Sequence, residues 1–501
     1  MKPFFRIFIG LLLVNLLVGC IRPADENAFR APENDSTPVP TQTGWIAPTH
    51  NPALPLSSPT PDTGRQLPAL RTDTVTYIVQ PGDTLAAIAE KYTLPLNTII
   101  EINQIENPDL LDVGMELILP PPNPASQGPA FKIIPDSELV RSPSAIGFDL
   151  NNFVNSTGGY LAVYKEKVND VEMTGAQIID RVSKEFSVHP HILLAWLEYQ
   201  GNWISSTAPT EIQQKYPAGY INQYYEGLYL QMAWAANNLN MGYYLWKVNA
   251  VAAWILPDDS IIPPDPTINA GTAAVQHLAS LLYNQDKWRE VVGKNGFIKI
   301  FNNYFGQAFD YSIDPLLPTD LTQPVLQLPF ENGTVWSFTG GPHGGWGTGS
   351  AWAALDFAPP GDALGCVVND AWVTAVSDGW VTRSENGVVV IDLDGDGYEE
   401  TGWTVLYLHI ETRDRIPVNT PVKAGERIGH PSCEGGVSNG THVHIARKYN
   451  GEWIPADQDL PFILDGWVSQ GTGIEYNGYL VKNEKIVEAW DSRKPENQIQ
   501  R

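Results

Sequence analysis

Residues 440–445 read Gly-Thr-His-Val-His-Ile, and this stretch decides how the carboxy-terminal third of the chain folds. In a β-strand, residues i and i+2 point to the same face. His442 and His444 should therefore face one site while Val443 faces a core. Nearby segments also alternate apolar and polar residues between Gly, Asp and Asn turns: 372–375, 379–383, 388–393 and 404–408. The pattern predicts a mainly antiparallel β domain over residues 326–465.

Further candidate metal ligands gather in the same part of the chain. Five of the nine histidines lie between His343 and His444, and Asp356 lies among them. His409 ends the apolar stretch Leu-Tyr-Leu-His. Zinc in a hydrolase takes three protein ligands of the nitrogen or oxygen type and leaves one position open for water. Two histidines and one carboxylate can supply these ligands, and the remaining histidines can act on a substrate.

This arrangement resembles the lysostaphin-type (LytM-like) zinc metalloendopeptidases of the cell wall over about residues 334–455. The resemblance includes Asp378-Gly379 and residues 422–429, which match hairpin repeats of that family. It implies cleavage of peptidoglycan peptides. It also implies a ligand set for Zn²⁺ and a catalytic pair: His343, Asp356 and His444 for the metal, and His409 and His442 for the pair.

One spacing departs from that family. Three residues usually separate the first histidine from the aspartate, whereas twelve separate His343 from Asp356. The Gly/Ser/Trp-rich insertion either loops out and leaves the geometry intact, or widens or covers the cleft. A relative that has lost its metal and serves as a scaffold or activator is the alternative. Such relatives usually lack several of the five side chains, all of which are present here.

The β domain carries two further features. One is a calcium-loop spacing, with candidate ligands at positions one, three, five and nine: Asp392, Asp394, Asp396 and Glu400. Position twelve is Trp403 and not the bidentate Glu of an EF-hand, so the segment is either a Ca²⁺ site or an acidic hairpin tip. The other feature is the pair Cys366 and Cys433. Outside the cytoplasm an even pair of cysteines usually forms a disulfide, and two buried free thiols are the alternative.

A small module is predicted over residues 73–121. Residues 77–85 read Tyr-Ile-Val-Gln-Pro-Gly-Asp-Thr-Leu and combine the end of a strand with a turn and a helix start. A second helix over 96–102 and a strand over 115–119 complete an α+β unit. The module resembles a LysM domain, which implies binding to N-acetylglucosamine-containing glycan and above all to peptidoglycan.

The middle of the chain, residues 136–325, follows a helical pattern, for example at Ala176, Ile179 and Val182. The segment that ends in Glu198 is similar to the region around the catalytic glutamate of lysozyme-like lytic transglycosylases. The resemblance implies a general acid at Glu198. Tyr199 stands where that family usually has Ser, so the alternative is that Glu198 caps or pairs locally and the domain is a binder or spacer.

The amino terminus predicts export. Lys2 and Arg6 precede a short apolar run, and Leu-Val-Gly-Cys at residues 17–20 resembles a bacterial lipobox. Residues 1–20 are therefore predicted to be a lipoprotein signal peptide, with lipid on Cys20 as a membrane anchor; an ordinary signal peptide is the alternative. The Pro/Thr-rich residues 21–72 are predicted to be a disordered tether, 122–135 a linker and 466–501 a carboxy-terminal extension.

Length and charge limit the function. A chain of 501 residues is too long for one compact domain. Its formal net charge of −25 repels phosphate backbones and argues against a nucleic-acid partner. The sequence predicts a multidomain, extracytoplasmic, lipid-anchored peptidoglycan hydrolase with a zinc endopeptidase domain. Its rivals are a non-catalytic binder and a glycan-cleaving enzyme that acts through Glu198.

Overall fold

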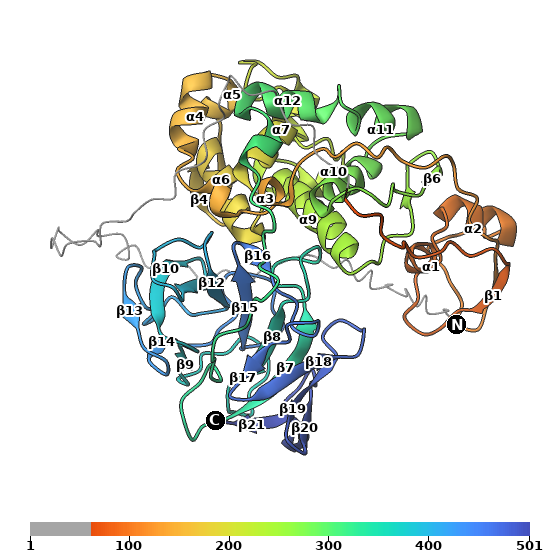
Figure 1. Ribbon diagram of the computed structural model, residues 1–501. Helices are drawn as coiled ribbons and strands as arrows, with labels where there is room; N and C mark the ends of the chain where they lie inside the picture. Colours follow the sequence, from red (N-terminus) through yellow and green to blue (C-terminus); the bar gives the residue numbers. More distant parts are fainter. Residues whose placement is uncertain (1–61) are drawn as a thin grey trace, which may run out of the picture.

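The computed structural model describes residues 62–501. The predicted signal peptide (1–20), Cys20 and most of the predicted tether lie outside the described residues. Figure 1 shows three parts: a small amino-terminal module, a helical domain beside it, and a β domain that packs against the helical domain. This confirms the predicted multidomain architecture. Between residues 62 and 501, no helix has the length and apolar character needed to cross a membrane.

The amino-terminal module contains two strands and two helices. β1 (Val75–Ile78) pairs antiparallel with β2 (Glu116–Leu119), and α1 (Leu85–Lys91) and α2 (Leu96–Asn103) lie between them in the chain. Thr84 begins α1 by accepting a hydrogen bond from the N–H of Ala87. The module has its own buried core. The predicted order of strand, helix, helix and strand is confirmed.

The last residues of the predicted tether are not free. The backbone N–H of Arg65 donates to the carbonyl of Pro266, and its guanidinium donates to the carbonyl of Trp246 at 2.6 Å. The guanidinium also lies 5.0 Å from the centroid of the Trp246 ring. Trp246 belongs to the last turn of α9 (Leu228–Lys247), where the negative end of the helix dipole favours a cation. Residues 62–66 are therefore held against the helical domain, which differs from the predicted disorder up to residue 72.

The predicted linker over residues 122–135 is held in the same way. The N–H of Ala125 donates to the carbonyl of Ile261 at 2.7 Å, and the N–H of Gly128 donates to that of Pro263 at 2.8 Å. Segments on both sides of the module thus contact the helical domain. The sequence missed this because backbone pairing leaves no side-chain pattern in a Pro-rich stretch.

The elements of the helical domain run from α3 to η3, within the predicted residues 136–325. Its α-helices are α3 (Asp136–Leu139), α4 (Leu150–Thr157), α5 (Tyr160–Val163), α6 (Gly175–Phe186), α7 (Pro190–Gly201), α8 (Glu211–Lys215), α9 (Leu228–Lys247), α10 (Ala270–Ser280), α11 (Gln285–Val291) and α12 (Phe297–Phe305). Its short 3₁₀ turns are η1 (Pro143–Ala145), η2 (Gln223–Tyr225) and η3 (Ala308–Tyr311), and its hairpins pair β3 (Lys165–Val168) with β4 (Val171–Thr174) and β5 (Trp254–Ile255) with β6 (Ile261–Ile262).

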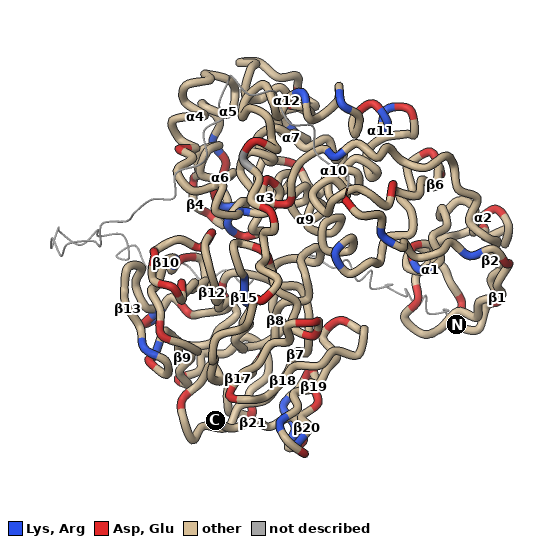
Figure 2. The backbone as a smooth tube through the Cα atoms, in the orientation of Figure 1, with Lys and Arg blue, Asp and Glu red and all other residues tan. Residues whose placement is uncertain are grey.

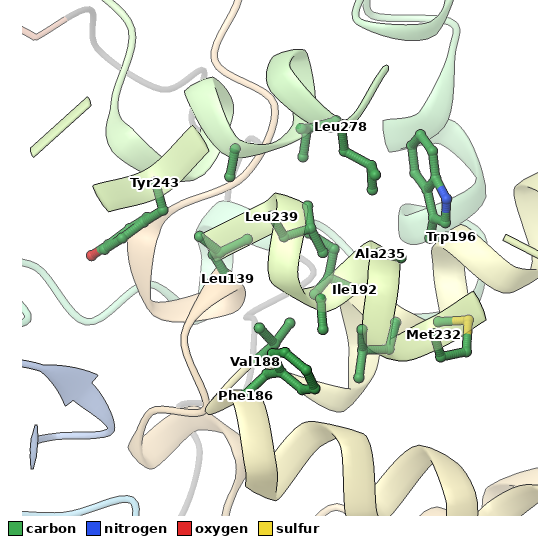
Figure 3. Packing of buried hydrophobic residues seen from close by; sticks show 14 of the residues in the cluster. Leu139, Phe186, Val188, Ile192, Trp196, Met232, Ala235, Leu239, Tyr243 and Leu278 are labelled. Carbon is green, nitrogen blue, oxygen red and sulfur yellow. The ribbon is translucent and has the colours of Figure 1, made fainter. Parts of the chain in front are cut away.

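Local sequence explains where the central helices begin. Thr174 and Gln177 form a capping box at the start of α6, and Pro190 occupies the first turn of α7. The buried faces of α7, α9 and α10 meet in the core that Figure 3 shows, with Ile192, Ala235 and Leu278 among its members. The predicted helical pattern is confirmed.

The β domain is built around a nine-stranded sheet with the order β13-β10-β11-β12-β15-β8-β7-β21 and with β16 paired to β15. Its strands are β7 (Val335–His343), β8 (Ala354–Ala358), β10 (Gly379–Glu385), β11 (Val388–Asp392), β12 (Trp403–Leu408), β13 (Pro421–Val422), β15 (Val443–Tyr449), β16 (Glu452–Trp453) and β21 (Gln498–Gln500). The two short strands β9 (Val373–Thr374) and β14 (Arg427–Gly429) form an antiparallel pair beside the main sheet. Neighbouring strands of the main sheet, such as β15 and β8, are also antiparallel.

The predicted extension over residues 466–501 belongs to the β domain. β17 (Ile463–Leu464), β18 (Trp467–Gly471), β19 (Gly478–Lys482) and β20 (Lys485–Glu488) form a four-stranded sheet. The turn η4 (Pro495–Asn497) leads into β21, which pairs with β7 in the main sheet. The extension therefore completes the edge of the sheet that carries His343.

Both faces of the main sheet are buried. Val388 and Val390 of β11 pack into the core of the helical domain, whereas Val389 and Ile391 pack into a second core on the opposite face. Residues 388–393 were predicted to alternate apolar and polar side chains, which is wrong: residues 388–391 of β11 are all apolar, and Asp392 ends the strand. A strand covered on both faces needs apolar side chains on both, and the helical domain supplies the second cover.

Ion pairs cross the interface between the two domains. Arg141 of the helical domain lies 2.7 Å from Glu400 of the β domain. Beside this pair, Arg383 binds Glu399 with two hydrogen bonds of 2.7 and 2.9 Å. Burial would raise the pKa of Glu399, but Arg383 and Lys448 hold it at about 2. Removing one partner from a buried network of this kind typically costs about 3–5 kcal/mol. Figure 2 shows Asp and Glu spread over all three parts of the molecule.

Candidate metal centre and catalytic histidines

The predicted zinc ligands come from three adjacent strands. His343 ends β7, Asp356 lies in the middle of β8, and His444 lies near the start of β15. β15 pairs with β8 so that His444 lies opposite Asp356. Gly340 of β7 also lies opposite Asp356, and a Cβ at that position would lie 2.6 Å from Asp356 Oδ2. Glycine at residue 340 therefore leaves the space that the carboxylate occupies.

Three ligand-type atoms form a compact triangle. His343 Nε2 lies 3.0 Å from His444 Nδ1 and 3.2 Å from Asp356 Oδ1, and His444 Nδ1 lies 3.3 Å from the same oxygen. Atoms about 2.0–2.1 Å from a tetrahedral zinc ion are separated by roughly 3.3 Å. The three side chains are almost fully buried. The triangle thus has the size, the donor types and the burial of a zinc ligand set.

The polar partners of the triangle also fit a cation. Asp356 Oδ1 is buried and accepts no hydrogen bond within the described residues. Burial would raise the pKa of Asp356, but the histidines around it hold that pKa well below its usual range. Burial would lower the pKa of His343, but Asp356 raises it above the usual value. The pocket therefore favours an added positive charge, which a bound metal ion would provide.

Backbone carbonyls orient both histidines of the triangle. His343 Nδ1 donates to the carbonyl of Gly341 at 2.8 Å, and His444 Nε2 donates to the carbonyl of Gly345 at 3.1 Å. Each donation leaves the other ring nitrogen, the one in the triangle, with its lone pair. Ligating histidines in metal sites are held in this way. Burial also lowers the pKa of His444, which keeps it neutral.

His409 and His442 form a second pair of imidazoles beside the triangle. Their ring centroids lie 4.5 Å apart, and His442 Nε2 lies 3.7 Å from Asp356 Oδ1. His409 Nδ1 donates to the carbonyl of Glu434 at 2.8 Å, and His442 Nδ1 donates to that of Gly440 at 2.7 Å. In each ring the bound Nδ1–H leaves the lone pair on Nε2. The two side chains therefore offer Nε2 atoms for proton transfer.

His409 is held in an unusual backbone conformation. It follows β12 directly and has a φ of 67°, in the left-handed region that non-glycine residues seldom occupy. Such residues concentrate at functional sites. Burial lowers the pKa of His409 well below its usual range, and His442 and His444 lower it further. His409 is therefore a neutral imidazole at neutral pH.

The insertion between His343 and Asp356 forms a loop beside the ligand triangle and leaves the triangle intact. Residues 344–353 form a compact loop in which the N–H of Gly345 donates to the carbonyl of Ala351 at 3.0 Å. The N–H of Trp346 donates to Ser350 Oγ at 3.0 Å. The loop supplies the Gly345 carbonyl that orients His444. We name residues 344–353 the insertion loop.

Two residues at the site were not predicted from the sequence. The ring of Tyr476 stacks on His343 with centroids 4.3 Å apart, and Glu475 accepts a hydrogen bond from the N–H of Gly344. Burial and the charges of Asp356 and Glu475 raise the pKa of Tyr476 to about 12, so its phenol stays protonated. Both residues lie in the Gly-rich turn before β19. No spacing in the sequence relates this turn to His343.

The other predicted features of the β domain lie outside the triangle. Cys366 and Cys433 are joined by a disulfide. Asp392, Asp394 and Asp396 come together, with one oxygen of each within 4.8 Å of the others. Glu400 is not part of that group, and its Oε1 accepts from Arg141 instead. The predicted set of calcium ligands is thus reduced to three aspartates, because Glu400 pairs with Arg141 of the helical domain.

Glu198 lies at the end of α7 and is bound locally. Its Oε2 accepts from the N–H of Ile204 at 2.8 Å and from that of Ser205 at 3.2 Å. Its Oε1 accepts from the hydroxyl of Tyr304 at 3.2 Å. These contacts correspond to the alternative in which Glu198 holds the chain after α7.

Another group of ligand-type side chains lies in the helical domain: Glu138, His189 and His191. His189 Nδ1 accepts a hydrogen bond from the backbone N–H of His191 at 3.1 Å, which leaves the ring proton on Nε2. This is the reverse of the tautomer that a ligating Nε2 needs. His191 Nδ1 lies 3.2 Å from Glu138. The group is best described as a cluster of one carboxylate and two imidazoles at the start of α7, where His189 is the N-cap residue.

Two known domain families match this chain. Residues 77–120 match the LysM domain, and residues 132–317 match the family described as LasA, N-terminal domain. The chain thus contains a LysM domain followed by a helical domain of the LasA type. This second match differs from the predicted resemblance to lysozyme-like transglycosylases.

Similar proteins of known activity include Protease LasA of Pseudomonas aeruginosa. It is 24% identical over 342 residues, which cover 64% of this chain and 74% of that protein. The cortical fragment-lytic enzyme of Bacillus subtilis is 50% identical over 44 residues, only 9% of this chain and 10% of that enzyme. The first similarity extends over most of both proteins, whereas the second is limited to a short segment.

Solved structures similar to this chain include the M23 metalloprotease pseudoalterin, at 24% identity and a TM-score of 0.29, over 36% of this chain and 100% of that one. The catalytic domain of lysostaphin from Staphylococcus simulans is 22% identical with a TM-score of 0.18, over 24% of this chain and 86% of that one.

Proposed function

We propose that this chain is a zinc-dependent endopeptidase that cleaves peptide bonds in peptidoglycan. The observation that carries the proposal is the triangle of His343, Asp356 and His444 beside the imidazoles of His409 and His442. Similarity to Protease LasA supports a protease, and the LysM domain supports a cell-wall substrate. All five side chains that the resemblance requires converge, which disfavours an inactive scaffold.

The site residues have distinct roles in this proposal. His343, Asp356 and His444 would hold Zn²⁺. The chemistry that zinc supplies when bound at such a site is polarisation of a carbonyl and activation of water at neutral pH. His409 is neutral and its Nδ1–H is bound, so its Nε2 would accept the proton that the attacking water loses and would give it to the leaving amine when the C–N bond breaks.

Two further side chains stabilise charge that develops on the substrate. His442 is oriented by Gly440 in the same way as His409 is by Glu434, and can donate to a developing oxyanion once it is protonated. Tyr476 keeps its hydroxyl proton because its pKa is raised, and its ring fixes the outer side of His343.

We also propose that the protein works outside the cytoplasm, on the membrane side of a bacterial cell wall. The LysM domain would bind glycan and raise the local concentration of substrate. The lipobox-like segment supports a lipid anchor on Cys20. Fractionation of cells that produce the full chain tests the anchor: the wild type should stay with the membrane fraction, and a soluble wild type would contradict it.

Mass spectrometry of soluble fragments tests the endopeptidase proposal. Purified peptidoglycan is incubated with residues 21–501, with and without a zinc chelator. We expect fragments with newly freed peptide amino groups, and their loss on chelation. Anhydro-sugar ends that disappear only in Glu198→Gln would instead place the chemistry in the helical domain. No products at all would favour a non-catalytic binder.

The three aspartates of the β domain are a candidate calcium site. Burial raises the pKa of Asp392 to about 7, and Asp394 contributes in the same direction, so a cation there would offset an unfavourable charge. Extracellular modules bind calcium with dissociation constants of about 10⁻⁴–10⁻³ M. Calcium at 10 mM should therefore stabilise the folded chain by about 1–3 kcal/mol.

Thermal unfolding with and without 10 mM calcium measures this effect. We expect Tm to rise by a few degrees in the wild type and to stay unchanged in Asp392→Asn. Magnesium at the same concentration controls for ionic strength. An equal rise in the wild type and the variant would rule out a site at these aspartates.

A further inference from the structure

The insertion loop is bound by a side chain of the helical domain. Asn237 lies on α9 and is half-buried. Its Oδ1 accepts a hydrogen bond from the N–H of Gly349 at 2.9 Å, and its Nδ2 donates to Thr348 Oγ1 at 3.1 Å. One amide thus uses both of its polar atoms on the same loop, which fixes the distance and the orientation of the loop relative to α9.

The loop lies against α9 too closely for side chains at two positions. A Cβ on Gly349 would lie 1.9 Å from the carbonyl oxygen of Asn237. Gly347 has a φ of 63°, and a Cβ there would lie 2.6 Å from Asn237 Oδ1. Glycines at these positions permit a contact between the backbone of the loop and the helix.

The same loop carries the carbonyl that orients a metal ligand. From Gly349 the contact continues within the loop, where Ser350 binds the N–H of Trp346 and Ala351 binds the N–H of Gly345. The carbonyl of Gly345 then accepts from His444 Nε2 at 3.1 Å. These hydrogen bonds, together with the short stretches of loop backbone between them, therefore join α9 to the imidazole of the metal site.

We propose that Asn237 is a positioning residue for the metal centre. Through Asn237, the helical domain would help to orient a metal ligand of the β domain. By holding the insertion loop, Asn237 keeps the Gly345 carbonyl where it orients His444. This inference deepens the proposed function and rests on it. Loss of a partner that orients a ligand typically lowers metal affinity by about 10–100-fold. Asn237 acts one step further away, so a loss of about 10-fold is expected.

The test compares zinc affinity in two neighbouring variants of the protein comprising residues 21–501. Asn237→Ala should bind zinc about 10-fold more weakly in competition with a chromogenic chelator. Its kcat should fall while KM stays unchanged, because the side chain of Asn237 binds the insertion loop and is not proposed to contact the substrate. Asn238→Ala is the matched control, since the amide of Asn238 donates to the carbonyl of Trp234 in its own helix. Asn238→Ala should bind zinc like the wild type.

A second variant tests the contact from the loop side. Thr348 is exposed, and Thr348→Val removes the hydroxyl that Asn237 binds without changing the helix. It should weaken zinc binding less than Asn237→Ala does, because one of two hydrogen bonds remains. The variant that combines Asn237→Ala with Thr348→Val should bind zinc about as weakly as Asn237→Ala alone. Asn237→Ala already removes the hydrogen bond to Thr348, so the two effects do not add.

Each outcome separates this inference from the proposed function. If Asn237→Ala and Thr348→Val bind zinc as tightly as the wild type does, the positioning role is wrong and the endopeptidase proposal stands. Higher activity with unchanged zinc affinity in Asn237→Ala would also overturn the role, because the loop would then act as a cover. A wild type that binds no zinc would overturn both proposals.

Discussion

His444→Ala is expected to lower kcat/KM on a peptidoglycan peptide by about 10³-fold or more, together with loss of bound zinc. His444 Nδ1 is one corner of the ligand triangle, 3.0 Å from His343 and 3.3 Å from Asp356. Two ligands that remain cannot hold zinc against water. A metal in a hydrolase contributes several kcal/mol to the transition state, and each 1.36 kcal/mol corresponds to about tenfold in rate. Zinc content by elemental analysis and kcat/KM on the same preparation measure the effect.

The control for His444→Ala is another histidine of the same domain. His430 donates to the carbonyl of Ala371 and packs on Trp372, outside the triangle. His430→Gln should keep one zinc per chain and most of the activity. Adding zinc back after chelation should restore the wild type and fail to restore His444→Ala. Full activity of His444→Ala without zinc would contradict the assignment of the metal centre.

His409→Asn is expected to lower kcat by about 10²–10⁴-fold while zinc content stays at one per chain. Asparagine is chosen because residue 409 has a φ of 67°, which Asn adopts more readily than Ala does. The variant removes the Nε2 that exchanges protons and leaves the ligand triangle in place. Single-turnover rates and zinc content separate the two effects.

The pH profile adds a second readout for His409. Its pKa lies well below the usual value because burial and two neighbouring histidines oppose its charge. In the wild type, activity should therefore persist into mildly acidic solution until His409 takes up a proton. His409→Asn should lose this acidic limb. If His409→Asn loses its zinc together with its activity, His409 is a ligand and not a general base.

Short-range patterns in the sequence were sufficient for several parts of the fold. The period of two in Thr-His-Val-His placed His442 and His444 together and Val443 in the core, where it is fully buried. The turn and cap at Thr84 located α1. These features depend on residues a few positions apart, so local backbone geometry is enough to predict them.

Long-range packing decided what the sequence could not. Residues 388–393 were predicted to alternate, whereas residues 388–391 of β11 are all apolar and pack into two cores, one of which belongs to the helical domain. Glu400 was assigned to a calcium loop by spacing, and the structure pairs it with Arg141, 259 residues away in the chain. Tyr476 reaches His343 from a turn with no motif of its own.

The sequence by itself therefore indicated the candidate side chains, because zinc accepts few donor types, a strand repeats every two residues, and the resemblance to lysostaphin-type peptidases assigned each of them a proposed role. The tertiary structure alone decided how they are oriented. The insertion loop sets the direction of His444 only because α9 binds that loop through Asn237. Such a contact joins residues more than a hundred positions apart and arises from the packing of one domain on another, which no local pattern encodes.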